Sequence, residues 1–481
     1  MRFAPIPMDH ATIKARFSQT TRPVVCIQGL GFVGIAMAIA VAAAKDKSGA
    51  PAYSVIGVDL PNASGKEKVS EINCGRLPVK ANDEHLVTSF HSAIDGGNLV
   101  ATTDAEAFGL ADISVVDVQL DVNLNDIADP KVDFTGFRGA INTLGKYMRA
   151  GTLVLVETTV PPGTCEKVVV SELDAALALR GLPAGSLLVA HSYERVMPGR
   201  DYFDSIVHFW RVFAGTTTAA ADACAQFLSR VIDVANYPLR RLHSTTASET
   251  AKVLENSYRA TNIAFIEEWG RFAEAVGVDL FEVIDAIRDR PTHNNIRQPG
   301  FGVGGYCLSK DPALGVVAAR QLLDVPELDF PFCRLAMDAN RRMPLVSVDL
   351  LRTALSGSLR GKRILLLGVS YRQDIGDTRH SPAEIFLRAC EGEGATVSAH
   401  DPMLTYWPEL DRTIRLEFPP VDGFDAIVFA VAHREYHVHD LVRWLGDARP
   451  VVLDANHVLT REQVRVLSNA GHRLVFIGKG N

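Results

Sequence analysis

The sequence predicts an α/β protein with two alternating α/β parts and a helical part between them. Short apolar runs, of the length that buried parallel strands need, alternate with helical stretches through about residue 215 and again from about residue 361. Between these parts a helical pattern continues from Thr245 to Val276, which is longer than an average helix, and Gly277 is a plausible stop. A chain of 481 residues is also too long for one core. We therefore expect several domains.

Composition narrows the class of protein. The net charge of −7 and the lack of a Lys/Arg block argue against a nucleic-acid partner. The seven cysteines stand singly, without a C-x-x-C pair, so we expect neither a disulfide framework nor a metal site, and a reducing cytoplasm fits best. Residues 1–22 lack the apolar core of a signal peptide, and the longest apolar run, Ile35 to Ala44, is too short to cross a membrane.

The first α/β part opens with a dinucleotide-binding pattern. The strand-like run Val24–Gln28 leads into Gly29-Leu-Gly31-Phe-Val-Gly34, a helical stretch to Lys45, and a second strand that ends in Asp59. In G-x-G-x-x-G the glycines serve a tight turn, close approach of a pyrophosphate and helix packing, and the acid accepts hydrogen bonds from a ribose. A carboxylate there also repels a 2′-phosphate. The pattern predicts a Rossmann-type domain that binds NAD through Gly29, Gly31, Phe32, Val33, Gly34 and Asp59.

The remaining elements give the expected domain boundaries. Further strands are predicted at 113–118, 152–156 and 186–190, and in the C-terminal part at 362–368, 396–401, 426–431 and 450–454, with a helix over 382–390. We expect an N-terminal extension (1–22), an NAD-binding domain (23–215), a central helical domain (216–330) and a C-terminal α/β domain (331–481).

A glycine-dense loop over residues 299–312 carries one thiol, Cys307, beside Lys310 and Asp311. Four glycines, at positions 300, 302, 304 and 305, let this backbone adopt positive φ and pass close to a bulky ligand. On its own, a cysteine is more often a small, inert core residue. Its neighbours argue for a chemical role.

Three segments together resemble the UDP-glucose/GDP-mannose dehydrogenase family. They are Glu249-Thr-Ala-Lys252-Val-Leu-Glu-Asn256-Ser-Tyr-Arg259, Gly304-Gly-Tyr-Cys307-Leu-Ser-Lys-Asp311, and Gly368-Val-Ser-Tyr-Arg-Gln-Asp-Ile-Gly-Asp-Thr-Arg379-His-Ser-Pro382. The resemblance runs in order from Val24 to about Asn456, and its details look most like the branch that acts on UDP-N-acetylhexosamines. It implies a Rossmann-type NAD domain, a central dimerisation domain with a long spine helix, and a C-terminal Rossmann-like domain for the UDP-sugar.

The implied activity is oxidation of the C6 alcohol of a nucleotide sugar to the uronic acid, by a homodimer, for surface polysaccharide precursors. Two NAD molecules are reduced for each sugar, and this four-electron chemistry gives Cys307 a task as the nucleophile that carries the aldehyde to a thioester. Lys252 and Asn256 are four apart on one predicted helix and therefore share a face, where they would stabilise an oxyanion. A solvated helix face is the alternative for this pair.

The resemblance assigns the other site residues. Glu194 matches the family's base for the hydrolytic water, although Tyr193 stands where the family usually has proline. Asp311 is expected to order Lys252 or a water, or to cap a helix. Substrate contacts are expected from Gly304 and Gly305, from Arg379, and from Arg297 near the loop.

A second departure lies near the cofactor. Gln119-Leu120-Asp121 replaces the family's Pro-Thr-Pro, so a threonine hydroxyl is missing, and Thr159 and Glu157 are left as polar neighbours of the nicotinamide. Three alternatives stay open: a UDP-glucose or GDP-mannose dehydrogenase, a two-electron hydroxyacid-type dehydrogenase that has no use for Cys307, and a non-catalytic nucleotide-sugar sensor. No motif in the sequence identifies the sugar.

Overall fold

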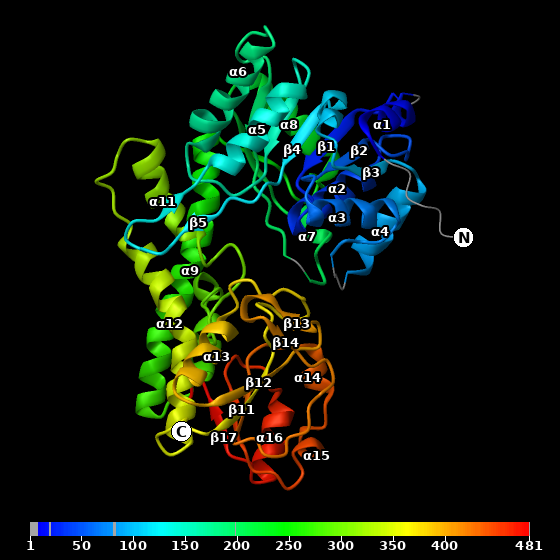
Figure 1. Ribbon diagram of the computed structural model, residues 1–481. Coiled ribbons are helices and arrows are strands. Elements are labelled where there is room, and N and C mark those ends of the chain that lie inside the picture. The colour runs from blue at the N-terminus through cyan, green and yellow to red at the C-terminus, as the bar shows by residue number, and fades with distance from the viewer. Residues whose placement is uncertain (1–7, 19–20, 80–82, 198, 481) are drawn as a thin grey trace. The chain divides into compact units, whose positions relative to one another are not determined.

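The computed structural model describes residues 8–18, 21–79, 83–197 and 199–480, which form two compact units (Figure 1). The first comprises Met1–Leu254 with Leu314–Asp329, and the second Glu255–Ala313 with Phe330–Asn481. The long helix α9 covers Thr245–Val276, the range that the sequence predicted. Residues 216–330, expected as a central domain, are divided between the units.

The first unit is built on an eight-stranded sheet with the order β10-β9-β8-β7-β4-β1-β2-β3. All neighbouring strands pair in parallel except β8 and β9. From β3 to β8 this is the strand order of dinucleotide-binding folds, as expected. The sheet continues past residue 215, because β10 pairs with β9. Its strands are β1 (Val24–Gln28), β2 (Ser54–Val58), β3 (Leu99–Thr102), β4 (Ile113–Val116), β7 (Leu153–Val156), β8 (Leu188–His191), β9 (Val212–Gly215) and β10 (Arg240–Arg241); β5 (Val122–Asn123) and β6 (Lys131–Val132) form a separate ribbon.

Helices cover both faces of this sheet, which is why its strands read as continuous apolar runs. One apolar cluster packs α2, α4 and α8 against the sheet, and another packs α1, α5, α6 and η1 against its opposite face (Figure 1). The helices are α1 (His10–Phe17), α2 (Phe32–Ala43), α3 (Ala63–Asn73), α4 (Glu84–Asp95), η1 (Ala105–Leu110), α5 (Thr135–Tyr147), η2 (Cys165–Val169), α6 (Val170–Leu179), α7 (Asp204–Val207), α8 (Thr218–Val231), α11 (Leu314–Val317) and η5 (Ala318–Leu322).

The expected N-terminal extension contains helix α1. Asp9 caps it by accepting a hydrogen bond from the amide of Thr12, and Ile13 and Phe17 are buried in the first unit. The amide of His10 donates to the side chain of Asp104, 2.9 Å away. The described part of the extension is therefore packed against the NAD-type sheet, while positions 1–7 and 19–20 fall outside the described residues.

The second unit has a five-stranded parallel sheet with the order β12-β11-β15-β16-β17. β12 pairs with one edge of β11, while β15 and the strands after it lie on the other side of β11. The boundary between β11 and β15 is therefore a topological switch point. The elements are α10 (Leu280–Arg288), η3 (Pro291–His293), η4 (Asp311–Ala313), α12 (Pro331–Ala354), β11 (Arg363–Leu367), α13 (Pro382–Gly392), β12 (Thr396–His400), β13 (Tyr406–Trp407), η6 (Pro408–Leu410), β14 (Arg412–Thr413), β15 (Ala426–Phe429), α14 (Arg434–Val438), α15 (Leu441–Leu445), β16 (Val451–Asp454), α16 (Arg461–Asn469) and β17 (Leu474–Phe476).

Both sheets use the same turn after their first strand. In the first unit Gly29, with φ of 94°, follows β1, and the amide after it donates to Asp59 at 3.0 Å. In the second unit Gly368, with φ of 95°, follows β11, and the amide after it donates to Asp401 at 2.9 Å. Each glycine amide also donates to the last carbonyl of the neighbouring strand, at 2.8 Å in both cases. Asp59 and Asp401 therefore hold equivalent turns.

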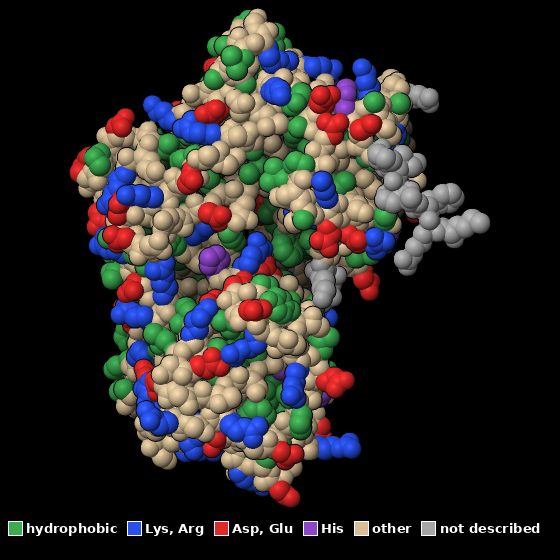
Figure 2. Space-filling view, in the orientation of Figure 1, with side chains coloured by type: hydrophobic (Ala, Val, Ile, Leu, Met, Phe, Trp, Pro, Cys, Tyr) green, Lys and Arg blue, Asp and Glu red, His purple; other side chains and the backbone are tan. Residues whose placement is uncertain are grey.

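On the face shown in Figure 2, acidic and basic side chains are interspersed over the described surface. Within the described ranges, no helix is both long and apolar enough to cross a membrane. In the same part of the chain, no three His, Cys, Asp or Glu side chains are arranged to hold a metal ion.

Candidate functional site

The glycine-rich turn after β1 lets helix α2 begin close to the strand. A Cβ at Gly34 would lie 1.9 Å from the carbonyl oxygen of Gly29, so only glycine lets α2 pack this closely. Gly31, in contrast, has nothing within 4 Å of the place of its missing side chain. Gly31 precedes α2 without a side-chain cap, and Phe32 and Val33 are only partly buried in the first turn. Amides at a helix N-terminus of this kind favour an anionic ligand.

Asp59 lies at the carboxyl end of β2, where the sequence predicted it. Its Oδ2 accepts hydrogen bonds from the amide of Leu30 at 3.0 Å and from Nζ of Lys68 at 2.9 Å. The ion pair with Lys68 was not foreseen. These contacts fix the carboxylate, and its binding to a ribose stays a prediction.

The predicted polar neighbours of the nicotinamide follow β7. Thr159 is partly buried there, while the hydroxyl of Thr158 donates to the carbonyls of Val116 and Val118 at 3.1 and 2.9 Å. Leu120 is buried where the family has its threonine. Because leucine has no hydroxyl, this position cannot make the contact of the family's threonine. The role of Thr159 remains a prediction.

Buried charges gather at the carboxyl ends of β7 and β8 in the first unit. Nζ of Lys252 donates to the backbone oxygen of Glu194 at 2.8 Å and lies 3.8 Å from Oε1 of the same residue. Arg211 and Glu157 form an ion pair of 2.5 Å in which both side chains are almost fully buried. The structure thus brings together Lys252 and Glu194, both predicted, and adds Arg211, which the sequence reasoning missed.

Asp117, directly after β4, joins these charges and was also missed. Both of its carboxyl oxygens are buried and have no hydrogen-bond donor among the described residues. Burial, followed by the nearby Glu157 and Glu194, raises the pKa of Asp117 well above its usual value. Three carboxyl groups therefore lie near two cations, and the raised pKa of Asp117 favours its neutral form. An acid at a strand end beside the glycine turn was the available sequence signal.

The ring of Tyr193 fills the place of the family's proline. It is buried, with Nζ of Lys252 5.4 Å and Cζ of Arg195 4.9 Å from its centre. Arg195 also donates to the phenol oxygen at 3.0 Å. Cations favour such positions over an aromatic face. The departure therefore supplies a contact to the predicted catalytic lysine.

In the second unit, Cys307 is exposed on a turn closed by the amides of Lys310 and Asp311, which donate to its carbonyl oxygen at 3.1 and 2.8 Å. Asp311 is fully buried. It accepts hydrogen bonds from Nδ2 of Asn256 at 2.7 Å and from Nζ of Lys310 at 2.9 Å. Asp311 thereby fastens the Cys307 turn to α9 through Asn256.

Gly304 and Gly305 have a packing role that the sequence did not suggest. A Cβ at Gly304 would lie 2.9 Å from Cβ of Tyr371, and one at Gly305 would lie 2.7 Å from its ring. Burial raises the pKa of Tyr371 to about 12. The two glycines admit this phenol beside the loop, and their contact with substrate stays a prediction.

Arg379 is held by its own loop. Its guanidinium makes a two-point contact with Asp377, at 3.0 and 2.6 Å, and lies over the ring of Tyr306 at 5.8 Å. The side chain is 44% exposed, which leaves part of it open to a ligand. Its predicted substrate contact is therefore geometrically possible within this unit.

A cavity of about 330 Å³ lies at the switch point of the second sheet. Ligands bind at this position in open α/β sheets. Arg372 lines the cavity. Burial, together with the charges of Arg297 and Arg372, lowers the pKa of Arg259. These three cations therefore lie close together and favour the binding of an anion. Of the three, only Arg297 was predicted from the sequence to contact the substrate. The lining consists of Phe301, Gly302, Ser370, Tyr371, Arg372, Gln373, Ser381, Pro382, Ala430, Val431, Ala432 and Asn456.

The predicted residues thus fall into two groups. The first unit contains the glycine turn, Asp59, Thr159, Glu194 and Lys252, and the second contains the remaining residues: Asn256, Arg297, Gly304, Gly305, Cys307, Asp311 and Arg379. Lys252 and Asn256 are one helical turn apart on α9.

Comparison with known proteins gives concordant matches along the chain. Residues 23–232 match the NAD binding domain of the UDP-glucose/GDP-mannose dehydrogenase family, residues 246–342 its central domain, and residues 365–461 its UDP binding domain. A UDP-N-acetyl-D-mannosamine dehydrogenase of Pyrococcus horikoshii is 30% identical, with 92% of this chain and 97% of that protein aligned.

Two solved structures share the fold. A UDP-D-ManNAc dehydrogenase from Pyrococcus horikoshii has a TM-score of 0.78 at 28% identity and covers 95% of this chain and 99% of its own. An NDP-N-acetyl-D-galactosaminuronic acid dehydrogenase from Methanosarcina mazei has a TM-score of 0.75 at 27% identity, with 98% of each chain covered. The chain therefore belongs to the UDP-glucose/GDP-mannose dehydrogenase family of NAD-dependent nucleotide-sugar dehydrogenases.

Proposed function

We propose that this enzyme oxidises the C6 alcohol of a UDP-N-acetylhexosamine to the uronic acid, with UDP-N-acetyl-D-mannosamine as the first substrate to test. The names of similar proteins support this sugar class. The observation that carries the chemistry is the exposed Cys307 on a turn fastened to α9 by the buried Asp311. A thiol that is both exposed and held by buried contacts suits a nucleophile.

The proposed reaction has two oxidations. NAD, when bound, accepts two electrons and one hydrogen as hydride, once in each oxidation. After the first, the alcohol has become an aldehyde, having also lost its hydroxyl proton. The Cys307 thiolate adds to the aldehyde carbon, and the former aldehyde oxygen takes up a proton, which gives a thiohemiacetal. The second oxidation converts this adduct to a thioester, and water releases the carboxylate and the thiol.

Lys252 and Glu194 have complementary roles in this scheme. The Lys252 ammonium, with the Asn256 amide, stabilises negative charge on the substrate oxygen during each oxidation and during hydrolysis. Glu194 takes a proton from the attacking water. The short distances between Lys252 and Glu194 support a shared task for them. Asp311 positions Asn256 and the Cys307 turn.

The UDP part of the substrate is assigned to the cavity at the second switch point. Its position and the arginines beside it support this assignment, because a diphosphate needs cations and a uridine needs a partly apolar pocket. Arg379, Gly304 and Gly305 are proposed to contact the sugar end. In the first unit, Gly29, Gly31, Phe32, Val33, Gly34, Asp59 and Thr159 are proposed to contact NAD.

The product stoichiometry tests the reaction. Purified enzyme is given a limiting amount of UDP-ManNAc, UDP-GlcNAc, UDP-GalNAc, UDP-glucose or GDP-mannose, and NADH and uronic acid are measured. We expect two NADH for each sugar with a UDP-N-acetylhexosamine. One NADH for each sugar would favour the two-electron alternative, and no turnover with any sugar would favour a sensor.

Two variants test the covalent route. Cys307→Ser should bind the substrate but form no acid, and uronic acid production at the wild-type rate would contradict the thioester. Glu194→Gln should accumulate enzyme carrying the sugar on Cys307, seen as added mass in the intact protein. Only unmodified enzyme at steady state would argue against Glu194 as the hydrolytic base.

We also propose a homodimer formed through α9. Five large apolar side chains on this helix are 46–56% exposed, and their spacing places them on one narrow stripe. An exposed stripe of this kind is typical of a subunit interface. It consists of Tyr258, Phe265, Trp269, Phe272 and Val276, and is called the α9 stripe below.

A cytoplasmic location and a role in surface polysaccharide precursor synthesis complete the proposal. The reducing compartment is supported by the seven cysteines, which all lie in the described residues and form no disulfide. Fractionation of cells and analysis of their surface sugars after gene deletion test these two points.

A further inference from the structure

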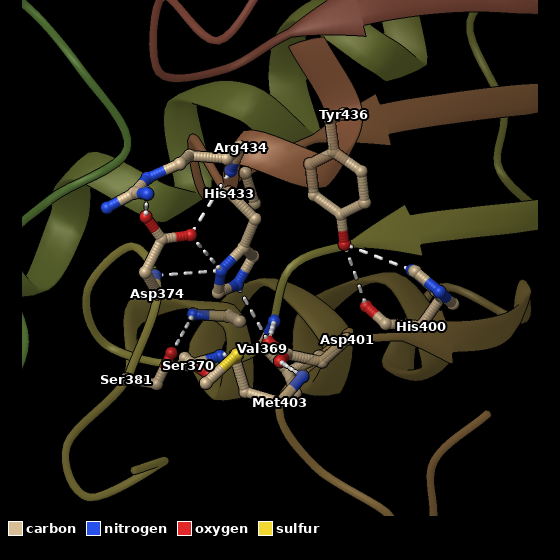
Figure 3. Close-up of polar contacts among 12 residues, drawn as sticks. Val369, Ser370, Asp374, Ser381, His400, Asp401, Met403, His433, Arg434 and Tyr436 are labelled. Carbon is tan, nitrogen blue, oxygen red and sulfur yellow. Dashed lines mark hydrogen bonds and ion pairs between the residues drawn. The ribbon is translucent and has the colours of Figure 1, made fainter. Parts of the chain in front are cut away.

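A buried cluster joins three loops at the carboxyl edge of the second sheet (Figure 3). Its centre is Asp401, which follows β12 and is fully buried. Oδ2 of Asp401 accepts hydrogen bonds of 2.9 Å from the amides of Val369 and Ser370 and from the hydroxyl of Ser370, and it lies 3.1 Å from Nε2 of His433. The Asp401 carboxylate is buried and occupied by partners within the protein, so it is not open to the ribose of a ligand.

The contacts of His433 determine where its ring proton lies. Nδ1 of His433 is 2.9 Å from the amide nitrogen of Asp374, which is a donor only, so Nδ1 is the acceptor. The proton of the neutral ring is then on Nε2, where it is donated to Asp401. His433 is fully buried and links the two aspartates through opposite sides of one ring.

These contacts fix both ends of the segment Ser370–Asp374. Ser370 is bound by Asp401, and Asp374 is bound by His433 and by Arg434, whose Nε lies 3.0 Å from its carboxylate. Asp374 has φ of 57°, in the left-handed region that residues other than glycine adopt at a cost. The contacts with His433 and Arg434 offset this cost.

The segment between the two fixed ends forms part of the cavity wall. Tyr371, Arg372 and Gln373 all line the cavity that we assign to UDP, as does Ser370. His433 is not among the lining residues, although its neighbour Ala432 is. His433 is therefore placed to act on a bound nucleotide only through the loop it holds.

We propose that His433 is a positioning residue for nucleotide binding, which holds Tyr371, Arg372 and Gln373 in the shape that receives the UDP part of the substrate. This inference rests on the proposed function of the cavity. The bond to Asp374 is the decisive one. Asp401 has four other donors, from Val369, Ser370 and Met403, while Nδ1 of His433 accepts a hydrogen bond from the amide of Asp374 at the far end of the segment.

Three variants separate the two ring contacts. In His433→Asn the side-chain oxygen reaches the place of Nδ1 and keeps an acceptor for Asp374. In His433→Gln the longer amide reaches the place of Nε2 and keeps a donor for Asp401, and His433→Leu keeps neither. The matched control is His472→Leu in the same unit, since His472 is a buried histidine whose ring nitrogens have no hydrogen-bond partner among the described residues.

The experiment measures the affinity of the full-length enzyme for UDP alone by calorimetry, together with KM and kcat for the nucleotide sugar and the melting temperature. We expect His433→Leu to weaken UDP binding and raise KM about tenfold, with kcat changed less than about twofold. His433→Asn should bind UDP more tightly than His433→Gln. His472→Leu should leave UDP affinity unchanged, because it replaces a buried histidine whose ring nitrogens make no hydrogen bond to the described residues of the cavity wall.

The outcomes distinguish this inference from the function beneath it. If the wild-type enzyme does not bind UDP, the assignment of the cavity fails and this inference fails with it. If the wild type binds UDP and His433→Leu binds it equally well, only the role of His433 is overturned. Should His433→Leu fail to fold, the order of the other two variants decides, and His433→Gln binding as tightly as His433→Asn would overturn the proposal.

Discussion

Tyr193 illustrates how a single residue at an unexpected position acquires a role. In the sequence this residue was only a departure from the family's proline, whereas the structure shows an aromatic ring with the Lys252 ammonium over it. A cation on a buried aromatic face is stabilised by about 1–2 kcal/mol. The ring therefore holds the predicted catalytic cation close to Glu194.

We expect catalysis to depend on the aromatic ring of Tyr193 and not on its hydroxyl. Tyr193→Leu is expected to lower kcat/KM about tenfold, because the Lys252 ammonium loses the aromatic face. Tyr193→Phe keeps the face and should retain nearly full activity, although it loses the bond from Arg195. Steady-state kinetics on the two variants measure this, and equal losses in both would contradict a role for the ring.

His191 makes stability depend on pH. Burial, and then the charge of Lys252, lowers the pKa of His191 to about 3, from 6.5 in an unfolded chain. Between these values the unfolded state binds a proton that the folded state does not, so stability falls as pH drops from 6.5 towards about 3, with a limiting slope of about 1.4 kcal/mol per pH unit. Above pH 6.5 this contribution is constant.

A neutral replacement should remove most of this acid sensitivity. Denaturant unfolding of His191→Gln at about pH 7 and about pH 5 is expected to show a smaller loss of stability on acidification than in the wild type. The control is His243→Gln, since His243 is exposed. A pH dependence that is the same in wild type and His191→Gln would contradict the prediction.

At the scale of elements, the glycine loop before Cys307 is held by close packing. Gly305 has φ of 80° and leaves no room for a Cβ beside Tyr371. Gly305→Val should therefore displace the loop and reduce activity at least about a hundredfold, since a small misplacement of a nucleophile is costly.

Gly357→Val separates backbone strain from this clash. Gly357 has φ of 92° in the same unit but nothing within 4 Å of its missing side chain. The two variants should lose similar stability from the backbone, and only Gly305→Val should lose activity. Equal activity in the two, measured by NADH formation, would contradict the packing role.

The elements that the sequence predicted well share a strong local signal. The apolar runs gave the strands, and the helical period gave α9 from Thr245 to Val276. Contacts between distant segments carried no such signal. The bond from Asn256 to Asp311 spans 55 residues, and the pair of Glu157 and Arg211 spans 54. Similarity to known motifs identified Asp311 and Asn256, but not the hydrogen bond that joins them.

At the scale of the whole molecule, the α9 stripe predicts an assembly. Trp269 is at its centre and is 46% exposed in the single chain. Trp269→Glu should convert a dimer to a monomer, because a charge buried in an apolar interface has no partner. Sedimentation at several protein concentrations measures this.

The control for this change is Leu179→Glu, which places the same charge on an exposed leucine of α6 outside the stripe. This variant should keep the mass of the wild type. A monomeric wild type, or a Trp269→Glu variant that stays dimeric, would exclude the α9 stripe as the interface.

The matching turns at Gly29 and Gly368 lead into different structures in the two units. In the first unit α2 begins three residues after its turn glycine, while in the second α13 begins fourteen residues after its counterpart. The extra residues include Tyr371, Arg372 and Gln373 of the cavity wall. The added length after the turn therefore supplies wall to the cavity of the second unit, whereas the first unit passes almost directly from its turn into a helix and leaves the amides of that helix end open to a ligand.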